Sequence, residues 1–331
     1  MKKIFIGIDF SKKTLDATVM RENYLHEKGE HLSFSNNKTG AMKLIKWVKG
    51  FGSIEECLFC GEDTGLYSKI ASETLVEQGC FMWLDSALRI KRSLGISREK
   101  NDKKDSRDIA LYAARFKDQA ECYIILDQAT EALKKLFTMR KKLVEAYNRL
   151  LVNYNESKKY FDNELLSDAF AIHEELIAQI KEKIKALEKE MKKIIKSNSE
   201  LNNTYNILSS MPGIGLINAT AFIVYTNNFK KFDYDARRIA SFWGVAPFGH
   251  TSGTSVKGTP HVSHYADSYL KSILSEATLC ATRFCPIISA YVARLKQAGK
   301  HKNVVLNNAK NKMIHILVAM IRNNEKFRKA A

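Results

Sequence analysis

The chain has 331 residues, 45% of them hydrophobic, which is enough to fill two or three domain cores rather than one. No segment reaches the roughly eighteen uninterrupted apolar residues that a membrane span needs, and the start of the chain lacks the apolar region of a signal peptide. We therefore expect a cytoplasmic protein that does not enter a membrane. The chain has 53 Lys and Arg and 36 Asp and Glu, which gives a net charge of +17. This excess favours nucleic acid as the partner, and the alternative is that the composition is generally basic without a specific partner.

An apolar strand opens the chain and ends on an acid. Ile4 to Ile8 form a β-branched run of strand length, which is typical of a buried central strand, and Asp9 follows directly. Burying the charge of Asp9 after this strand costs free energy unless the carboxylate is paired or binds a cation, so Asp9 is a candidate for a functional site. The alternative is that Asp9 caps the turn at 11–13, beyond which residues 15–20 form the returning strand of a hairpin.

The same arrangement occurs a second time further along the chain. A third strand at 31–35 and a helix at 41–51 lead to an apolar strand at 56–61, which ends on Glu62. A helix running to about residue 77 and a fifth strand at 81–84 follow. Glu62 is therefore a second carboxylate directly after a buried strand.

Two further acids open a helix after a basic stretch at 89–104. Asp102 and Asp105 are three residues apart, so on a helix they project to one side and both can reach one cation. Helix N-termini also favour acids, and the alternative is that Asp102 is the N-cap and Asp105 a first-turn charge. Asp63 and Asp108 lie close to the chosen acids and are the residues most easily confused with them.

The four acids Asp9, Glu62, Asp102 and Asp105 together suit phosphoryl transfer. Hard divalent cations, Mg²⁺ first and Mn²⁺ as a substitute, prefer oxygen ligands, and two such ions about 4 Å apart clamp the attacking and leaving oxygens of a phosphodiester exchange. Two strand-end acids followed by two at the front of a helix is also the order in which a nuclease with a ribonuclease H-like sheet assembles its site.

A long helical stretch separates this region from the rest of the chain. Residues 128–199 contain no Gly or Pro, and their apolar residues recur at helical spacing on either side of a break at 161–170. Alternating Glu and Lys on the other faces of the second half are typical of a long antiparallel helical hairpin or coiled coil, which usually pairs with a partner. We expect no catalytic role for this stretch.

Prolines appear for the first time beyond residue 201 and mark a third domain. The turn Pro212-Gly213-Ile214-Gly215 precedes an apolar helix at 216–225 and resembles the turn of helix-hairpin-helix modules, in which N–H groups at a helix start hold a phosphate. We expect a short helix at 236–242 and three helices at 267–281, 286–298 and 304–322, with basic residues that can contact a nucleic-acid backbone.

Residues 243–258 are expected to form a loop rich in small and hydroxyl side chains. Ser252 precedes Gly253, so its hydroxyl can be exposed and closely approached, as a nucleophile must be. A serine next to a glycine is also an ordinary feature of loops, which is the alternative interpretation. Ser255 is the second candidate.

Six motifs occur in order along almost the whole chain, and together they resemble the DEDD insertion-sequence transposases of the insertion-sequence one-ten family, which includes Piv-like DNA invertases and bridge-RNA-guided recombinases. Two positions depart from the family pattern, with Ala266 in place of a glycine and Lys271 in place of an arginine. The motifs are Gly7-Ile8-Asp9-Phe10-Ser11-Lys12, Glu62-Asp63-Thr64-Gly65-Leu66-Tyr67, Lys100-Asn101-Asp102-Lys103-Lys104-Asp105, Met211-Pro212-Gly213-Ile214-Gly215, Gly244-Val245-Ala246-Pro247 and Ser252-Gly253.

The resemblance implies an α/β plus α fold, with a RuvC-like or ribonuclease H-like domain at 1–125, a coiled-coil hairpin at 126–200 and a mostly helical transposase domain at 201–331. It implies a serine recombinase in which Ser252 forms a phosphoserine link to DNA. The acidic tetrad of a partner subunit, corresponding to Asp9, Glu62, Asp102 and Asp105, would hold Mg²⁺ or Mn²⁺. It also implies a structured non-coding guide RNA and a homo-oligomer, either a dimer or a tetramer built as a dimer of dimers.

Three other functions fit parts of the sequence. A RuvC-like nuclease would use the same acids with water as the nucleophile. A sugar kinase or actin-like ATPase also opens with a Gly-Ile-Asp strand, but the glycine-rich phosphate loops of those folds do not occur after the second strand. A scaffold that only binds RNA or DNA would need the positive charge and no metal.

Overall fold

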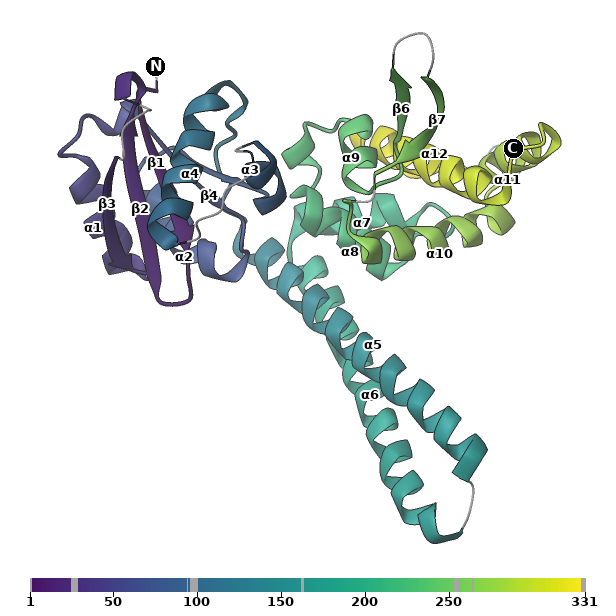
Figure 1. The fold of residues 1–331 in the computed structure, drawn as a ribbon. Coiled ribbons are helices and arrows are strands. Elements are labelled where there is room, and N and C mark those ends of the chain that lie inside the picture. Colours follow the sequence, from purple (N-terminus) through teal and green to yellow (C-terminus); the bar gives the residue numbers. More distant parts are fainter. Residues whose placement is uncertain are drawn as a thin grey trace. The chain divides into compact units, whose positions relative to one another are not determined.

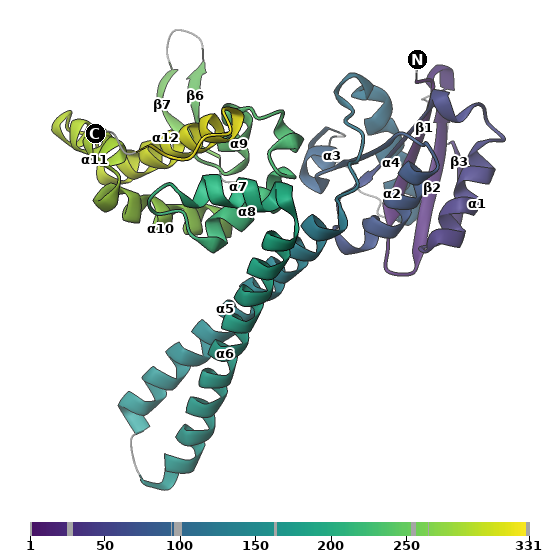
Figure 2. The same cartoon turned by 180° about the vertical axis from the view of Figure 1, so that it is seen from behind.

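The protein is described by a computed structural model that covers residues 2–24, 29–93, 95, 101–161, 164–252, 256–263 and 265–328, without the side chains of 24, 250–257, 259 and 260. The chain forms two compact units, Met1–Ile125 and Leu126–Ala331. Figures 1 and 2 show strands with covering helices in the first unit and mostly helices in the second.

The first unit is built on a five-stranded sheet in the order β3-β2-β1-β4-β5. The central strand β1 (Ile4–Phe10) pairs antiparallel with β2 (Thr14–Arg21), which pairs antiparallel with β3 (Glu30–Ser35). On its other side β1 pairs parallel with β4 (Cys57–Glu62), and β4 pairs parallel with β5 (Met82–Asp85). All five predicted strands form, and the carboxyl ends of β1, β4 and β5 meet at one edge of the sheet.

Helices cover both faces of this sheet (Figure 1). The helices α1 (Lys38–Val48) and α2 (Leu66–Glu77) share one apolar core with the sheet. The helices α3 (Ala87–Ser93) and α4 (Asp102–Arg115) share a second core with its other face. Successive side chains of a strand point to opposite faces, so β1 contributes Ile6 and Ile8 to the first core and Phe5 to the second.

The second unit begins with two long helices, α5 (Gln128–Phe161) and α6 (Ser167–Ser197), which contact each other and run in opposite directions (Figure 1). Arg140 Nε of α5 donates to Glu188 Oε1 of α6 at 2.6 Å, and Tyr154 packs its ring against Phe170. The break expected at 161–170 includes the boundary between these helices but extends too far, since α6 already begins at Ser167. Pairing of this stretch as a coiled coil with a partner stays a prediction.

The remainder of the second unit is mostly helical around one large apolar core, as the sequence predicts. The turn at 212–215 packs against this core, since a Cβ on Gly213 would lie 2.2 Å from the Ala277 carbonyl oxygen. The helices are α7 (Ser199–Ser209), α8 (Leu216–Thr226), α9 (Ala236–Phe242), α10 (Ser268–Phe284), α11 (Pro286–Gln297) and α12 (Lys302–Arg322). Short 3₁₀ helices occur at Glu22–Tyr24, Ile54–Glu56, Lys117–Gln119, Glu164–Leu166 and Lys230–Phe232.

The region expected to be a loop at 243–258 is instead largely a β-hairpin. The strands β6 (Pro247–Ser252) and β7 (Val256–Val262) pair antiparallel, with a register shift between Phe248 and His250. The prediction was wrong because the small and hydroxyl residues mask the Phe, Thr and Val side chains that favour strand pairing.

Among the described residues, no single helix is both long and apolar enough to cross a membrane. The pair α10 and α11 meets the length and composition criteria only when taken together, and its two helices meet at an angle of 96°.

Candidate active site

Asp9 lies near the carboxyl end of β1, and another residue closes the turn that follows. Ser11 Oγ accepts the backbone N–H of Thr14 at 2.9 Å and that of Lys13 at 3.3 Å. The capping role considered for Asp9 therefore belongs to Ser11. Asp9 is half-buried at the edge of the sheet.

Asp9 and Glu62 project from the face of the sheet that α4 covers. Ile8 and Phe10 lie in the core under α1 and α2, so strand alternation directs Asp9 to the opposite face. On β4, Cys60 lies in the core under α4, and Glu62 follows it by two residues. Ile8 pairs with Gly61 in the parallel register, which makes Asp9 and Glu62 neighbours across adjacent strands.

The helix α4 reaches this edge because β1 carries a glycine beneath it. A Cβ on Gly7 would lie 2.0 Å from the Ser106 carbonyl oxygen and 2.3 Å from the Ala110 nitrogen, so only glycine allows this approach. The hydroxyls of Thr18 and Ser106 also share a buried hydrogen bond of 2.7 Å between β2 and α4. These contacts hold the first turn of α4 against the strand that carries Asp9.

The two helical acids occupy the first turn of α4, and neither is the cap. Asn101 is the N-cap, and its Oδ1 accepts the backbone N–H of Lys104 at 2.8 Å. The interpretation of Asp102 as N-cap is therefore wrong. Asp102 is exposed and Asp105 is half-buried beside Ser106.

The electrostatics of Asp9 show that the acids are close enough to interact. Its pKa is raised from 3.8 to about 6, first by burial and then by the negative charges of Asp105, Asp102, Glu62 and Asp16 in decreasing order. The neighbouring charges that act most strongly on Asp9 are therefore all carboxylates. Among the described residues, the structure thus brings all four predicted acids into one negative region.

Asp16 is a fifth acid of this region that the sequence analysis missed. It pairs directly with Asp9 in the β1–β2 register and is 8% exposed. Thr18, two residues further along β2, bonds to α4, so Asp16 lies on the same face. His31 Nε2 of β3 is 3.5 Å from Asp16 Oδ1. The sequence feature that could have identified Asp16 is an acidic residue within an otherwise apolar strand.

Three neighbouring acids have other surroundings. Asp85, at the end of β5, accepts hydrogen bonds from Tyr112 Oη at 2.7 Å and Arg89 Nη1 at 3.0 Å, so its charge is compensated within the unit. Asp63 is exposed and its Oδ1 accepts the Gly65 N–H in the turn before α2. Asp108 lies one turn beyond Asp105 on α4, and burial raises its pKa.

The donor set suits a hard divalent cation. All the candidate ligands are carboxylates, which such cations prefer, and the raised pKa of Asp9 marks a region where a cation would relieve repulsion. Within the described part of the chain, no three His, Cys, Asp or Glu side chains already stand in an arrangement that could hold a metal. The residues fit the metal by the chemistry of their carboxylate oxygens.

Ser252 is the last residue of β6 in the second unit. Its side chain, like those of His250 and the strand residues opposite, lies outside the described part of the structure. Ser255 and His264 also lie outside the described residues. The hairpin nevertheless places Ser252 at the far end of a strand that starts beside α9.

Two transposase family models match the chain in sequence order. A DEDD transposase model matches residues 6–156, which contain the four acids, and the model described as transposase IS116/IS110/IS902 family matches residues 205–293, which contain Ser252. The chain belongs to the IS110 transposase family. It is therefore an enzyme that acts on DNA, and the DEDD match indicates that this transposase depends on a divalent metal and has a RuvC-like first domain.

Curated relatives of this transposase include proteins that match from end to end. The pilin gene-inverting proteins of Moraxella bovis and Moraxella lacunata are each 26% identical over 339 residues, which is 99% of this chain and 99% of each relative. An uncharacterized 43.6 kDa protein of insertion element IS110 from Streptomyces coelicolor is 29% identical over 116 residues, 35% of this chain and 28% of the relative.

Proposed function

We propose that this transposase cuts and rejoins DNA through a phosphoserine link at Ser252, with Mg²⁺ held by Asp9, Glu62, Asp102 and Asp105. The observation that carries the proposal is the grouping of these carboxylates on one face at one edge of the first sheet, with α4 held against β1 by the close contact at Gly7. A bound divalent cation would stabilise the charge that develops on a phosphate under attack.

The proposed reaction is an exchange of phosphoesters. Ser252 Oγ attacks a DNA phosphorus and forms a new P–O bond, while the bond from phosphorus to a deoxyribose oxygen breaks and the released oxygen takes up a proton. A deoxyribose hydroxyl of the joining strand then attacks the phosphoserine, and the serine recovers its proton. The energy of the broken bond is kept, so strands exchange without an external source. Mn²⁺ would substitute for Mg²⁺ because it accepts the same oxygen ligands.

An assembly of several chains and a guide RNA belong to the same proposal. Ser252 and the acids lie in different units of the chain, and we infer that the serine of one subunit works with the acids of a partner in a dimer or a dimer of dimers. The net charge of +17 supports the binding of further nucleic acid besides the DNA ends, such as a structured non-coding RNA. The names of the Moraxella relatives support inversion of a DNA segment as the outcome, and the family models support transposition.

The covalent intermediate is the direct test. The full-length protein, with the end DNA of its element, any co-purifying RNA and Mg²⁺, should give a DNA-linked protein band on a denaturing gel. Ser252→Ala should abolish this band, whereas Ser255→Ala, a matched change in the same hairpin, should keep it. The band should also require the metal and disappear with Glu62→Gln but not with Asp63→Asn.

Two results would contradict the proposal. DNA cleavage that continues with Ser252→Ala would indicate a RuvC-like nuclease that uses water as the nucleophile. A band that persists with Ser252→Ala and disappears with Ser255→Ala would move the nucleophile to Ser255.

A further inference from the structure

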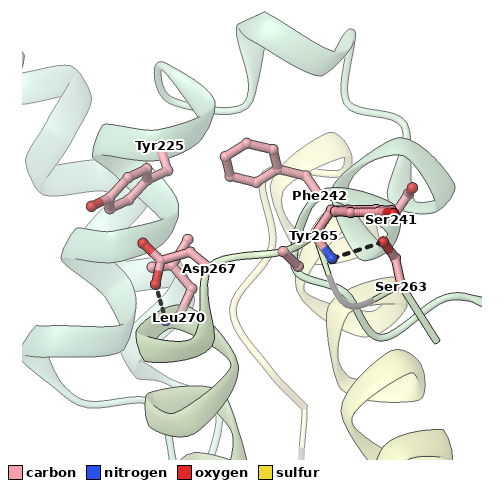
Figure 3. A pocket seen from close by; sticks show the side chains of 8 residues that line it. Tyr225, Ser241, Phe242, Ser263, Tyr265, Asp267 and Leu270 are labelled. Carbon is pink, nitrogen blue, oxygen red and sulfur yellow. Dashed lines mark hydrogen bonds between the residues drawn. The ribbon is translucent and has the colours of Figure 1, made fainter. Parts of the chain in front are cut away.

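A pocket of about 360 Å³ opens in the second unit at the root of the β6–β7 hairpin (Figure 3). Its walls come from the last turn of α8, the end of α9 and the segment from the end of β7 into α10. Its volume is near the low end of the range of about 300–1,000 Å³ typical of small-ligand sites, so it suits a single ring system. The lining residues are Tyr225, Ser241, Phe242, Ser263, Tyr265, Ala266, Asp267 and Leu270.

Three aromatic rings line the pocket, and two of them are held in place by the core. The ring centroids of Tyr225 and Phe242 are 6.4 Å apart, and the Tyr225 ring also meets the buried Phe137 edge-on at 5.9 Å. The third ring, Tyr265, is 65% exposed. Flat rings held at the wall of a pocket provide faces on which another aromatic system can stack.

The polar atoms of the pocket can recognise an edge of such a ring. Asp267 is the N-cap of α10, and its Oδ1 accepts the N–H groups of Tyr269 at 2.8 Å and Leu270 at 3.4 Å. In the part of the chain that the structure describes, Oδ2 takes no part in the cap, so it can accept from a ligand. The Ser263 hydroxyl oxygen accepts the Tyr265 N–H at 3.2 Å, which leaves its hydrogen for donation (Figure 3).

The Asp267 carboxylate favours a base over a phosphate as the part of a nucleotide that enters the pocket. A phosphate inside the pocket would be repelled by Asp267, whereas the amino group of a cytosine, adenine or guanine would donate to it. The nearby positive charges belong to two lysines that are not among the residues lining the pocket. Lys141 Nζ is 4.0 Å from Asp267 Oδ1, and Lys271 follows Asp267 by four residues on the same face of α10.

We propose that this pocket binds one unpaired nucleobase of a strand that lies along the hairpin, with an amino-bearing base preferred over thymine. The base stacks on the aromatic walls and donates to Asp267, while Lys141 and Lys271 face the flanking phosphates. The inference rests on the proposed function, since the hairpin that carries Ser252 leads into this pocket: β7 ends at Val262, which pairs with Pro247 at the start of β6, and Ser263 of the pocket follows directly. A base held there would fix the position of the strand relative to Ser252.

Oligonucleotide binding tests the proposal without any cleavage. Full-length Ser252→Ala protein in EDTA is titrated with short single-stranded oligodeoxycytidine, oligodeoxythymidine and an abasic oligomer of equal length and charge, above neutral pH. We expect the cytidine strand to bind at least about fivefold more tightly than the abasic strand, as stacking on aromatic side chains provides. The thymidine strand should lie between them. The same oligomers made of RNA show whether the base comes from DNA or from RNA.

Three variants assign the effect to the pocket. Tyr265→Ala removes an exposed ring and should reduce the preference for base-bearing strands, whereas Tyr160→Ala, which removes a 72% exposed ring at the end of α5, should not. Asp267→Asn keeps the helix cap, because an amide oxygen also accepts, but it presents an amide donor to the ligand. This variant should reverse the preference between cytidine and thymidine strands.

Two outcomes would overturn the proposal. In the first, the base preference is the same in wild type, Tyr265→Ala and Asp267→Asn. In the second, these variants alter the molecular mass of the assembly by light scattering without altering oligonucleotide binding, which would assign the pocket to a basic side chain of a second copy of this chain. A missing phosphoserine band with intact base preference would refute only the proposed reaction, so the two failures are distinguishable.

Discussion

At the scale of single residues, the site depends on acids that share one edge of a sheet but differ in their neighbours. Asp85 has Arg89 and the Tyr112 hydroxyl on its carboxylate, so it is compensated and serves the packing of α4 and β5. Asp9 instead faces other carboxylates, which together with burial raise its pKa to about 6. An uncompensated acid of this kind is typical of a functional site.

This pKa predicts how Asp9 affects stability in the metal-free protein. Because the folded pKa exceeds the unfolded value of 3.8, the stability present below pH 3.8 is lost as the pH rises through about 6. Asp9→Asn cannot ionise, so it should melt at the same temperature as wild type below pH 3.8 and about 2–4 °C higher above pH 6. Thermal unfolding in EDTA across this range measures the difference.

A second variant serves as the control for this result. Asp105→Asn removes the neighbouring charge that acts most strongly on Asp9 and should move the wild-type transition to a lower pH. A melting difference between Asp9→Asn and wild type that does not change with pH would contradict the electrostatic account.

The cap of α4 predicts a separation between stability and metal binding. Asn101→Ala removes the acceptor for the Lys104 N–H and should cost about 0.5–2 kcal/mol of stability. Asp102→Asn leaves this cap intact and removes a charge that repels Asp9, so it should not lower the melting temperature, but it should weaken the binding of Mg²⁺ or Mn²⁺. Isothermal titration with Mn²⁺ and thermal unfolding of both variants measure the two effects. Equal metal affinity in wild type and Asp102→Asn would remove Asp102 from the ligand set.

At the scale of elements, the site is an arrangement of α4 on β1. The acids at the carboxyl ends of β1 and β4 need a helix that approaches the sheet closely enough to bring its first turn beside them. Gly7 allows this approach, and the hydrogen bond between Thr18 and Ser106 joins the same helix to β2. The close packing of α4 on β1 therefore brings the acids of the helix beside the acids of the strands.

Gly7→Ala tests this coupling. The added Cβ would overlap the backbone of α4, so the helix must shift, and we expect a loss of about 1–3 kcal/mol or more in stability together with a loss of DNA cleavage. Gly50→Ala is the matched control, since its Cβ would meet only the Trp47 carbonyl oxygen, at 3.2 Å. Denaturant unfolding and the cleavage assay at a temperature where both variants are folded give the comparison. Full cleavage by folded Gly7→Ala would show that the position of α4 does not matter to the acids.

At the scale of the whole molecule, most of the excess positive charge lies in the second unit. Residues 1–125 contain 21 Lys and Arg and 18 Asp and Glu, a net charge of +3, whereas residues 126–331 contain 32 and 18, a net charge of +14. The chain has 17 more basic than acidic residues, and the negative region around Asp9 stands in contrast to this background. Such a distribution attracts the phosphate backbone of nucleic acid broadly while keeping acids for a metal in one place.

The excess charge predicts a steep dependence of nucleic-acid binding on salt. The slope of log affinity against log salt concentration should be about −0.9 for each phosphate neutralised on a duplex and about −0.7 on a single strand. Fluorescence anisotropy over a series of salt concentrations measures it. Replacing Lys141 or Lys271 should make the slope shallower by about one phosphate. A flat salt dependence would argue against backbone contacts as the main source of affinity.

The sequence by itself determined the five strands of the first sheet, most of the helices and the positions of the four candidate acids along them. Apolar runs that end in Asp9 and Glu62, and a helix that opens with Asp102 and Asp105, are local patterns that follow from burial and helix periodicity. Local pattern did not suffice at 243–258, where pairing between two weak strand sequences produced a hairpin.

Only the tertiary structure decided which acids share a face and what covers them. Asp16 stands opposite Asp9 because of the register of β1 and β2, and α4 lies on Gly7 because its apolar side fits that face of the sheet. The pocket around Tyr265 likewise joins segments from α8 to α10 that are separate in the sequence. Such contacts depend on strand register and on the packing of distant elements, which no local run of residues specifies.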